Sequence, residues 1–241
     1  MPALPACTSG GSNGWFSRPK SSSEWLDLAL DAEHPDDRRR GIIGLAKSRD
    51  GAADWAMTVY DTVARTDHDA MVRCAALQAM AKSAGDPQVP TALGILNSTT
   101  QKEPTIRPAP GSVRWEAAKL LLRIVDRYAY AESRRQQIVD TLLQRLAGDP
   151  DRNVRLTVID ALAYFAQEPV PDALVEVLEE DDFALKNAAE SALISLTGTT
   201  QHHDPIAWRQ WLAETPDPFV NAGQAPAEVT ADSRSKWQWP W

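Results

Sequence analysis

Apolar residues recur at helical spacing along most of the chain, from about residue 22 to residue 214. The clearest stripe contains Val154, Val158 and Leu162, which are four residues apart and therefore share one face of a helix. The preceding segment, 133–146, carries a second apolar stripe and is predicted to be its partner helix. No alternation of β-branched and polar residues competes with this pattern, so the predicted fold class is all-α.

The same pair of predicted helices recurs along the chain. Each second helix carries a short signature, usually an aliphatic residue and then a cation, followed four and eight residues later by small or apolar side chains. Internal repetition at a period of tens of residues is typical of solenoids, in which every unit stacks on its neighbours. The predicted pairs are 24–31 with 37–47, 53–64 with 70–83, 90–96 with 112–127, 133–146 with 154–165, and 172–178 with 184–196.

These copies resemble HEAT repeats, which are helix pairs of about 40 residues. That family typically has an Asp before its second helix, then Val followed by Arg or Lys, then an Ala-Leu pair. The resemblance implies a right-handed α-solenoid of about five helix pairs that serves as a scaffold, an adaptor or occasionally an enzyme. The first copy has Asp37 in place of Val, and the third has Pro110 in place of Asp, after a long polar loop. The other three match at Asp69, Val72, Arg73, Ala79 and Met80, at Asp151, Val154, Arg155, Ala161 and Leu162, and at Asp182, Leu185, Lys186, Ala192 and Leu193.

The segment after the last copy resembles the closing unit of bacterial HEAT-like proteins. Gly198 is expected to end the last repeat helix. Asp204 is expected to cap a short helix that has Pro205 in its first turn. Trp208 and Trp211 would then cover the hydrophobic face that a terminal repeat otherwise exposes.

The two ends of the chain differ from the repeat region, which is predicted to span residues 22–214. Residues 1–21 are rich in Ser, Gly and Pro and indicate a flexible tether. Residues 215–241 hold few aliphatic residues and indicate a loose tail. Its end, which contains Trp237, Trp239 and Trp241, has three interpretations: it folds back on the groove of the array, binds a partner, or lies at a membrane interface.

Composition narrows the class of partner. The chain has 241 residues, a formal net charge of −8 and a pI of about 5.0, which argues against a general nucleic-acid or anionic-membrane surface. No apolar run reaches the roughly 18 residues of a transmembrane helix. The two cysteines provide no disulfide framework, and His202 and His203 lack a third ligand at metal-binding spacing. We therefore expect no cofactor and no metal, and a protein or peptide as partner.

The second helices also carry a series of cations, for which two interpretations exist. They form either a strip that binds anions or a set of structural ion pairs, each with a neighbouring Asp across the repeat interface. The second interpretation is favoured, because the acidic residues of the motif lie close by. The cations are Arg38, Arg73, Arg114, Arg155 and Lys186.

The concave face of such an array is made mainly by the second helices, and positions 3, 6 and 10 after the aliphatic residue are expected to be exposed there. This mixture of charges with one aromatic residue favours a protein or peptide ligand and a non-catalytic scaffold. The alternative is a HEAT-like enzyme of the bilin lyase or DNA glycosylase type, with Glu116 or Asp160 as the carboxylate. A deep pocket around a buried carboxylate would favour that alternative. The predicted partner-binding residues are Gln78, Lys82, Glu116, Lys119, Arg123, Thr157, Asp160 and Tyr164.

The sequence around Cys7 suggests where in the cell the protein is located. The sequence Leu4-Pro5-Ala6-Cys7 fits the end of a bacterial lipoprotein signal, and a Thr-Ser-Gly-Gly tether follows it. The charged and apolar regions of such a signal are expected upstream of Met1. With an upstream start, the protein is expected to be a lipoprotein of the cell envelope, anchored to the membrane through Cys7; otherwise it is expected to be cytoplasmic.

Overall fold

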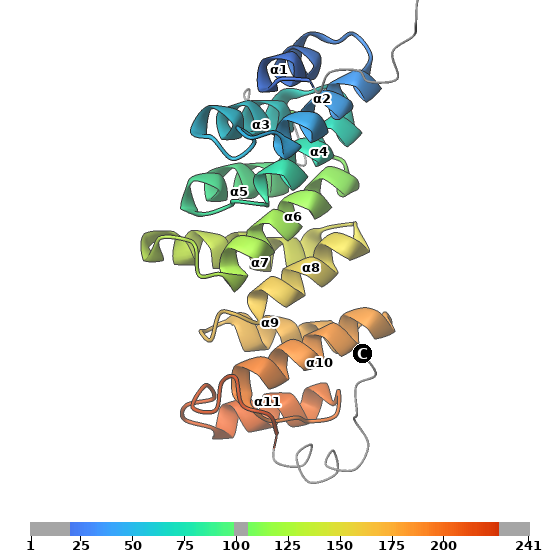
Figure 1. Cartoon of the computed structure of the whole chain (residues 1–241). Coiled ribbons are helices and arrows are strands. Elements are labelled where there is room, and N and C mark those ends of the chain that lie inside the picture. The colour runs from blue at the N-terminus through green and yellow to red at the C-terminus, as the bar shows by residue number, and fades with distance from the viewer. Residues whose placement is uncertain (1–19, 99–105, 227–241) are drawn as a thin grey trace, which may run out of the picture.

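The computed structural model describes residues 20–98 and 106–226, and every regular element within these ranges is a helix (Figure 1). Consecutive helices form five packed pairs, and one more helix follows the last pair, so the predicted all-α repeat fold is confirmed. The pairs are α1 (Ser22–Asp31) with α2 (Pro35–Lys47), α3 (Asp54–Thr66) with α4 (Ala70–Met80), α5 (Val89–Asn97) with α6 (Gly111–Asp126), α7 (Arg135–Gly148) with α8 (Arg152–Leu162), and α9 (Val170–Val177) with α10 (Phe183–Thr197); α11 (Pro205–Glu214) closes the series, and short 3-10 turns, Asp86–Gln88 and Glu132–Arg134, precede α5 and α7.

The pairs stack in a single line, as Figure 1 shows. Within the described residues, every extensive contact joins helices of the same pair or of adjacent pairs. The second helices α2, α4, α6, α8 and α10 contact one another more extensively than the first helices do. One continuous apolar core runs from Ala29 in α1 to Trp208 in α11. This linear arrangement is that of a helical solenoid.

The Asp of the repeat motif begins the second helix in three copies. Asp69, Asp151 and Asp182 are the N-caps of α4, α8 and α10, and each carboxylate accepts hydrogen bonds from two backbone N–H groups of the first turn. These N–H groups have no partner inside the helix, so the cap removes an unsatisfied donor and favours helix initiation at that residue. In the third copy, Pro110 precedes α6 and provides no side-chain cap.

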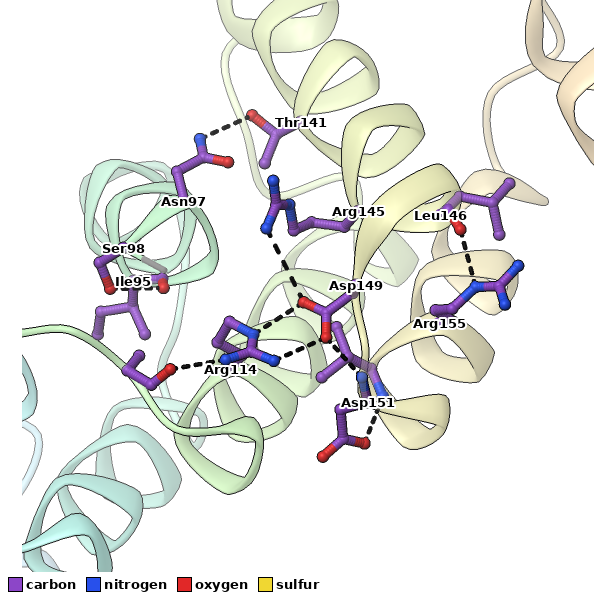
Figure 2. A network of polar contacts seen from close by, with 12 residues as sticks. Ile95, Asn97, Ser98, Arg114, Thr141, Arg145, Leu146, Asp149, Asp151 and Arg155 are labelled. Atoms are coloured by element: carbon purple, nitrogen blue, oxygen red, sulfur yellow. Dashed lines mark hydrogen bonds and ion pairs between the residues drawn. The ribbon is translucent and has the colours of Figure 1, made fainter. Parts of the chain in front are cut away.

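Three of the five cations form ion pairs with the next repeat, which agrees with the structural interpretation; the partner is an Asp for Arg38 and Arg114, as predicted, and a Glu for Arg155. The guanidinium of Arg38 donates to both carboxylate oxygens of Asp67, at 2.9 and 3.0 Å. That of Arg114 donates to both oxygens of Asp149 at 2.8 Å (Figure 2). Arg155 donates in the same way to Glu180. Each acceptor lies between the two helices of the following pair, so the ion pair fixes one repeat against the next.

Arg73 reaches the same loop of the next repeat without a carboxylate. It is fully buried, and among the described residues its guanidinium donates only to the backbone carbonyls of Ala64, Arg107 and Pro108. The long loop before α6 supplies two of these carbonyls, so an acidic partner is replaced by backbone. The fifth cation, Lys186, makes no side-chain hydrogen bond or ion pair within residues 20–98 and 106–226.

The C-terminal cap forms as predicted. Gly198 ends α10 in a left-handed conformation, with φ of 70°. Asp204 caps α11, and Trp208 is completely buried, with the ring of Trp211 edge-on at 5.8 Å. Glu190 has a role in this cap that was not predicted from the sequence. Its buried carboxylate accepts hydrogen bonds from the Trp208 indole N–H at 2.8 Å, the His203 N–H at 3.1 Å and the Thr200 hydroxyl at 2.6 Å.

Part of the segment assigned to the C-terminal tail packs on the array. The N–H of Gly223 donates to the carbonyl of Ser195 in α10, at 2.8 Å. The backbone of Asn221 approaches Gly198 so closely that a side chain there would collide with it, which requires glycine at that position. The chain therefore returns to the end of α10 before Pro226. Cys7, Trp237, Trp239 and Trp241 lie outside the described residues.

Candidate functional site

A groove with a volume of about 770 Å³ lies on the face made by the second helices α6, α8 and α10. Four of the predicted partner-binding residues line it: Lys119 and Arg123 from α6, Asp160 from α8, and Tyr164 just after α8. The structure thus brings half of the predicted set to one surface. Their partner-binding role remains a prediction.

The repeat register explains why the surface is hollow at this place. Positions 6 and 10 of three successive copies line the groove, and their side chains become smaller toward the C-terminus. Long side chains of α6 form one wall, and the small hydroxyl side chains of α10 leave space opposite them. The residues, in pairs, are Lys119 and Arg123, Asp160 and Tyr164, and Ser191 and Ser195.

Tyr164 is held in a fixed orientation inside the groove. Its hydroxyl donates to a carboxylate oxygen of Asp126 at 2.7 Å, and its ring meets Tyr128 edge-on at a centroid distance of 6.4 Å. The hydrogen bond to Asp126, together with burial, raises the pKa of Tyr164 to about 12. The phenol therefore stays protonated near neutral pH and acts as a donor.

Three charged side chains of the groove have no partner of their own. Arg123 and Arg127 are exposed and make no side-chain hydrogen bond or ion pair within the described part of the chain. The same holds for Asp160, whose carboxylate reaches solvent although the surrounding protein removes enough water to raise its pKa. Charges left free in this way are available to a ligand, because nothing has to be broken before they bind it.

Two of the predicted exposed residues are buried, which is a correction to the sequence analysis. Glu116 and Thr157 are only 8% and 7% exposed. Both occupy position 3, which faces the adjacent second helix rather than solvent. Glu116 accepts hydrogen bonds from Gln78 at 3.0 Å and from Lys119 at 2.8 Å, and its carboxylate is thus already engaged by the array.

Trp115 also lies at the interface of these second helices, and it was not predicted as a site residue. Trp115 is partly exposed, its indole N–H donates to the Thr157 hydroxyl at 3.1 Å, and the Lys119 ammonium lies 4.4 Å from its ring centroid. It stands at position 2, which the expected pattern of exposed positions left out. The sequence did contain a signal for it: Trp115 is a large aromatic residue at the position that Cys74 occupies in the preceding copy.

Gln78 and Lys82 lie on α4 and in the turn after it, and they do not line the groove. Both are exposed, but their polar ends are engaged by the array. Gln78 contacts Glu116, and the Lys82 ammonium donates to the carbonyl of Ala46 at 3.0 Å. The eight predicted partner-binding residues therefore do not form one surface: some line the groove, some lie at the interface of second helices, and some lie on the N-terminal repeats.

Residues 20–98 and 106–226 contain no group of three His, Cys, Asp or Glu side chains placed to hold a metal ion. His202 and His203 lie in a left-handed turn before α11, where their backbone serves the cap. Burial raises the pKa of the Cys74 thiol, and its sulfur contacts the Ser112 carbonyl at 3.7 Å. In the same ranges, none of the helices combines the length and apolarity that crossing a bilayer requires.

Comparison with known proteins agrees with this architecture. Residues 103–194 match the family model of HEAT repeats. Among solved structures, the chain is similar to an engineered protein, with 18% sequence identity and a TM-score of 0.51 over 83% of this chain and 94% of that one. At this identity the similarity concerns the fold alone. A search of curated proteins found no match.

Proposed function

We propose, from the premise that the chain contains HEAT repeats, that it is a non-catalytic scaffold whose groove over α6, α8 and α10 binds a protein or peptide. The observation that carries this proposal is the set of unpaired charges in the groove. Arg123, Arg127 and Asp160 together offer both signs of charge beside the aromatic ring of Tyr164. A polypeptide segment can satisfy all of them, whereas a polyanion would meet the carboxylates of Asp126 and Asp160.

A scaffold is better supported than a lyase or glycosylase. Glu116, the more buried of the two carboxylates considered for catalysis, is hydrogen-bonded to Gln78 and Lys119 and lies between helices. Asp160 stands at the surface of an open groove. The arrangement thus provides recognition groups, and no observation favours a particular reaction.

The test is affinity capture from the native cell with quantitative mass spectrometry, using three forms of the chain. In Ser191→Trp, a large side chain fills the groove from α10. In Arg49→Glu, a strongly exposed cation outside the groove is reversed. Proteins that are captured by the wild type and by Arg49→Glu, but at least tenfold less by Ser191→Trp, are ligands of the groove. An identical set of captured proteins for all three forms would refute the proposal.

For the subcellular localisation, we propose that a protein whose translation starts upstream of Met1 is lipidated on Cys7, as the Leu4-Pro5-Ala6-Cys7 sequence indicates. Labelled palmitate offered to cells that express the extended gene should appear on the wild-type product. The Cys7→Ser product should carry none. A stop codon in frame just upstream of Met1 would contradict this proposal and return the protein to the cytoplasm.

A further inference from the structure

The unpaired groups of the groove match the chemistry of an indole ring. An indole offers an aromatic face, which a cation can approach to within about 6 Å of the centroid, and one N–H donor. Arg123 and Arg127 are exposed cations without a partner in the described residues, and Asp160 is an acceptor in the same condition. A tryptophan placed between them would satisfy both kinds of group.

Two tryptophans of the array are already held by such contacts. The Lys119 ammonium lies 4.4 Å from the ring centroid of Trp115. The indole N–H of Trp208 donates to the carboxylate of Glu190 at 2.8 Å. The groove presents both kinds of group on one surface, the cations Arg123 and Arg127 and the carboxylate of Asp160.

The groove also has the room that large rings need. Its α10 wall is made of Ala188, Ser191, Ala192 and Ser195, all small. Its volume of about 770 Å³ lies in the range of roughly 300–1,000 Å³ that is typical of sites burying a drug-sized ligand.

The C-terminal end of the described residues lies close to the groove. The hydrogen bond from Gly223 to Ser195 brings the end of the described residues to the α10 wall of the groove. Ten residues, 227–236, separate Pro226 from Trp237. An extended segment of that length reaches about 33–36 Å. The distance from α10 to α6 is two helix spacings, or about 16–20 Å, so the segment is long enough to cross the groove.

From these observations we propose that the segment Trp237-Gln238-Trp239 occupies the groove of its own chain. One indole lies against the guanidinium groups of Arg123 and Arg127, and an indole N–H donates to Asp160. An outside ligand then has to displace the tail before it binds. This inference rests on the proposed function only in taking the groove as the ligand-binding surface.

The experiment uses the full chain and a fluorescein-labelled peptide with the sequence of residues 234–241, whose binding is followed by fluorescence anisotropy. In the Trp237→Ala/Trp239→Ala chain the groove is open, and the peptide should bind. In the wild type, the attached tail competes at an effective concentration in the millimolar range. The apparent Kd of the peptide should therefore be at least tenfold weaker for the wild type than for the double variant.

Further variants locate the binding site. Added to the double Trp variant, Arg123→Glu or Ser191→Trp should each weaken peptide binding at least tenfold, whereas Arg49→Glu should change it less than twofold. A peptide with Ala in place of Trp237 and Trp239 should not bind. Far-ultraviolet circular dichroism of each variant verifies that the helices are retained.

The inference is overturned if the peptide does not bind the double Trp variant, or if Arg123→Glu and Ser191→Trp leave its binding unchanged. The proposed function survives that result as long as Ser191→Trp still abolishes capture of cellular proteins. Conversely, groove-dependent binding of the peptide without groove-dependent capture would support the tail as occupant and refute the outside partner.

Discussion

The ion pair between Arg114 and Asp149 provides the sharpest test of how adjacent repeats are held together. The Asp149 carboxylate has no solvent exposure and accepts two hydrogen bonds from the Arg114 guanidinium, both at 2.8 Å, and one from the Asp151 N–H at 2.9 Å (Figure 2). In the wild type the Arg114 side chain is only 8% exposed, and in Asp149→Ala its guanidinium keeps the hydrogen bond to the Ala109 carbonyl but loses its ion pair. Removing one partner of a buried pair costs about 3–5 kcal/mol.

Urea unfolding followed by circular dichroism at 222 nm measures this loss. With a denaturant dependence of about 2 kcal/mol per molar, the midpoint of Asp149→Ala should fall by roughly 1.5–2.5 M. Asp149→Asn keeps an acceptor for the Asp151 N–H but loses the charge, so its midpoint should lie between those of the wild type and Asp149→Ala.

The matched control is Arg152→Ala. Arg152 pairs with Asp182 at a position where its side chain is 55% exposed, and such surface pairs contribute about 0–1 kcal/mol. A midpoint shift for Asp149→Ala no larger than that of Arg152→Ala would show that the buried pair does not stabilise the repeat junction.

Three further predictions concern the core, the response to pH and the C-terminal cap. Leu162→Ala should cost about 2–5 kcal/mol, because Leu162 is fully buried, while Asp160→Ala should change the free energy of unfolding by less than about 0.5 kcal/mol; equal urea midpoints would refute the register. Burial alone would raise the pKa of Asp67, but the hydrogen bonds from Arg38 and from the backbone lower it below its ordinary value of 3.8. A lowered folded-state pKa stabilises the protein above the unfolded-state pKa, and this contribution disappears as the pH falls through the folded-state value. The difference in free energy of unfolding between the wild type and Asp67→Asn should therefore shrink from about pH 6 to pH 3, and a constant difference would contradict it. Glu190→Ala should cost about 1–3 kcal/mol by leaving the Trp208 indole N–H without an acceptor, and solvent should then quench Trp208 fluorescence, whereas unchanged quenching and stability would contradict the role of Glu190 in the cap.

The sequence predicted those features that a repeated local pattern determines. Helical periodicity located the five pairs, and the motif Asp at 69, 151 and 182 located the start of three second helices because capping is a local interaction. The cap at Gly198 and Asp204 was predictable for the same reason.

Features that depend on how two repeats meet could not be predicted. Position 3 was expected to face solvent, but the close approach of neighbouring second helices buries Glu116 and Thr157 there. Two of the three carbonyl partners of Arg73 belong to Arg107 and Pro108, which precede α6, and this long-range contact has no sequence signal. The groove depends on the size difference between α6 and α10 side chains, which becomes apparent only when three repeats are placed side by side.

The ion pairs between repeats also bear on how such an array changes in length during evolution. Arg38, Arg114 and Arg155 each belong to one repeat, and their acceptors Asp67, Asp149 and Glu180 belong to the next. Within the described residues, α7 with α8 is the pair that uses both halves: Asp149 accepts from the repeat before it, and Arg155 donates to the repeat after it. A duplicate of this pair would therefore bring both halves of an ion pair to its new junction. Duplication of that pair is thus expected to be tolerated more readily than loss of the last one, where Glu190 and Trp208 join α10 to the closing helix.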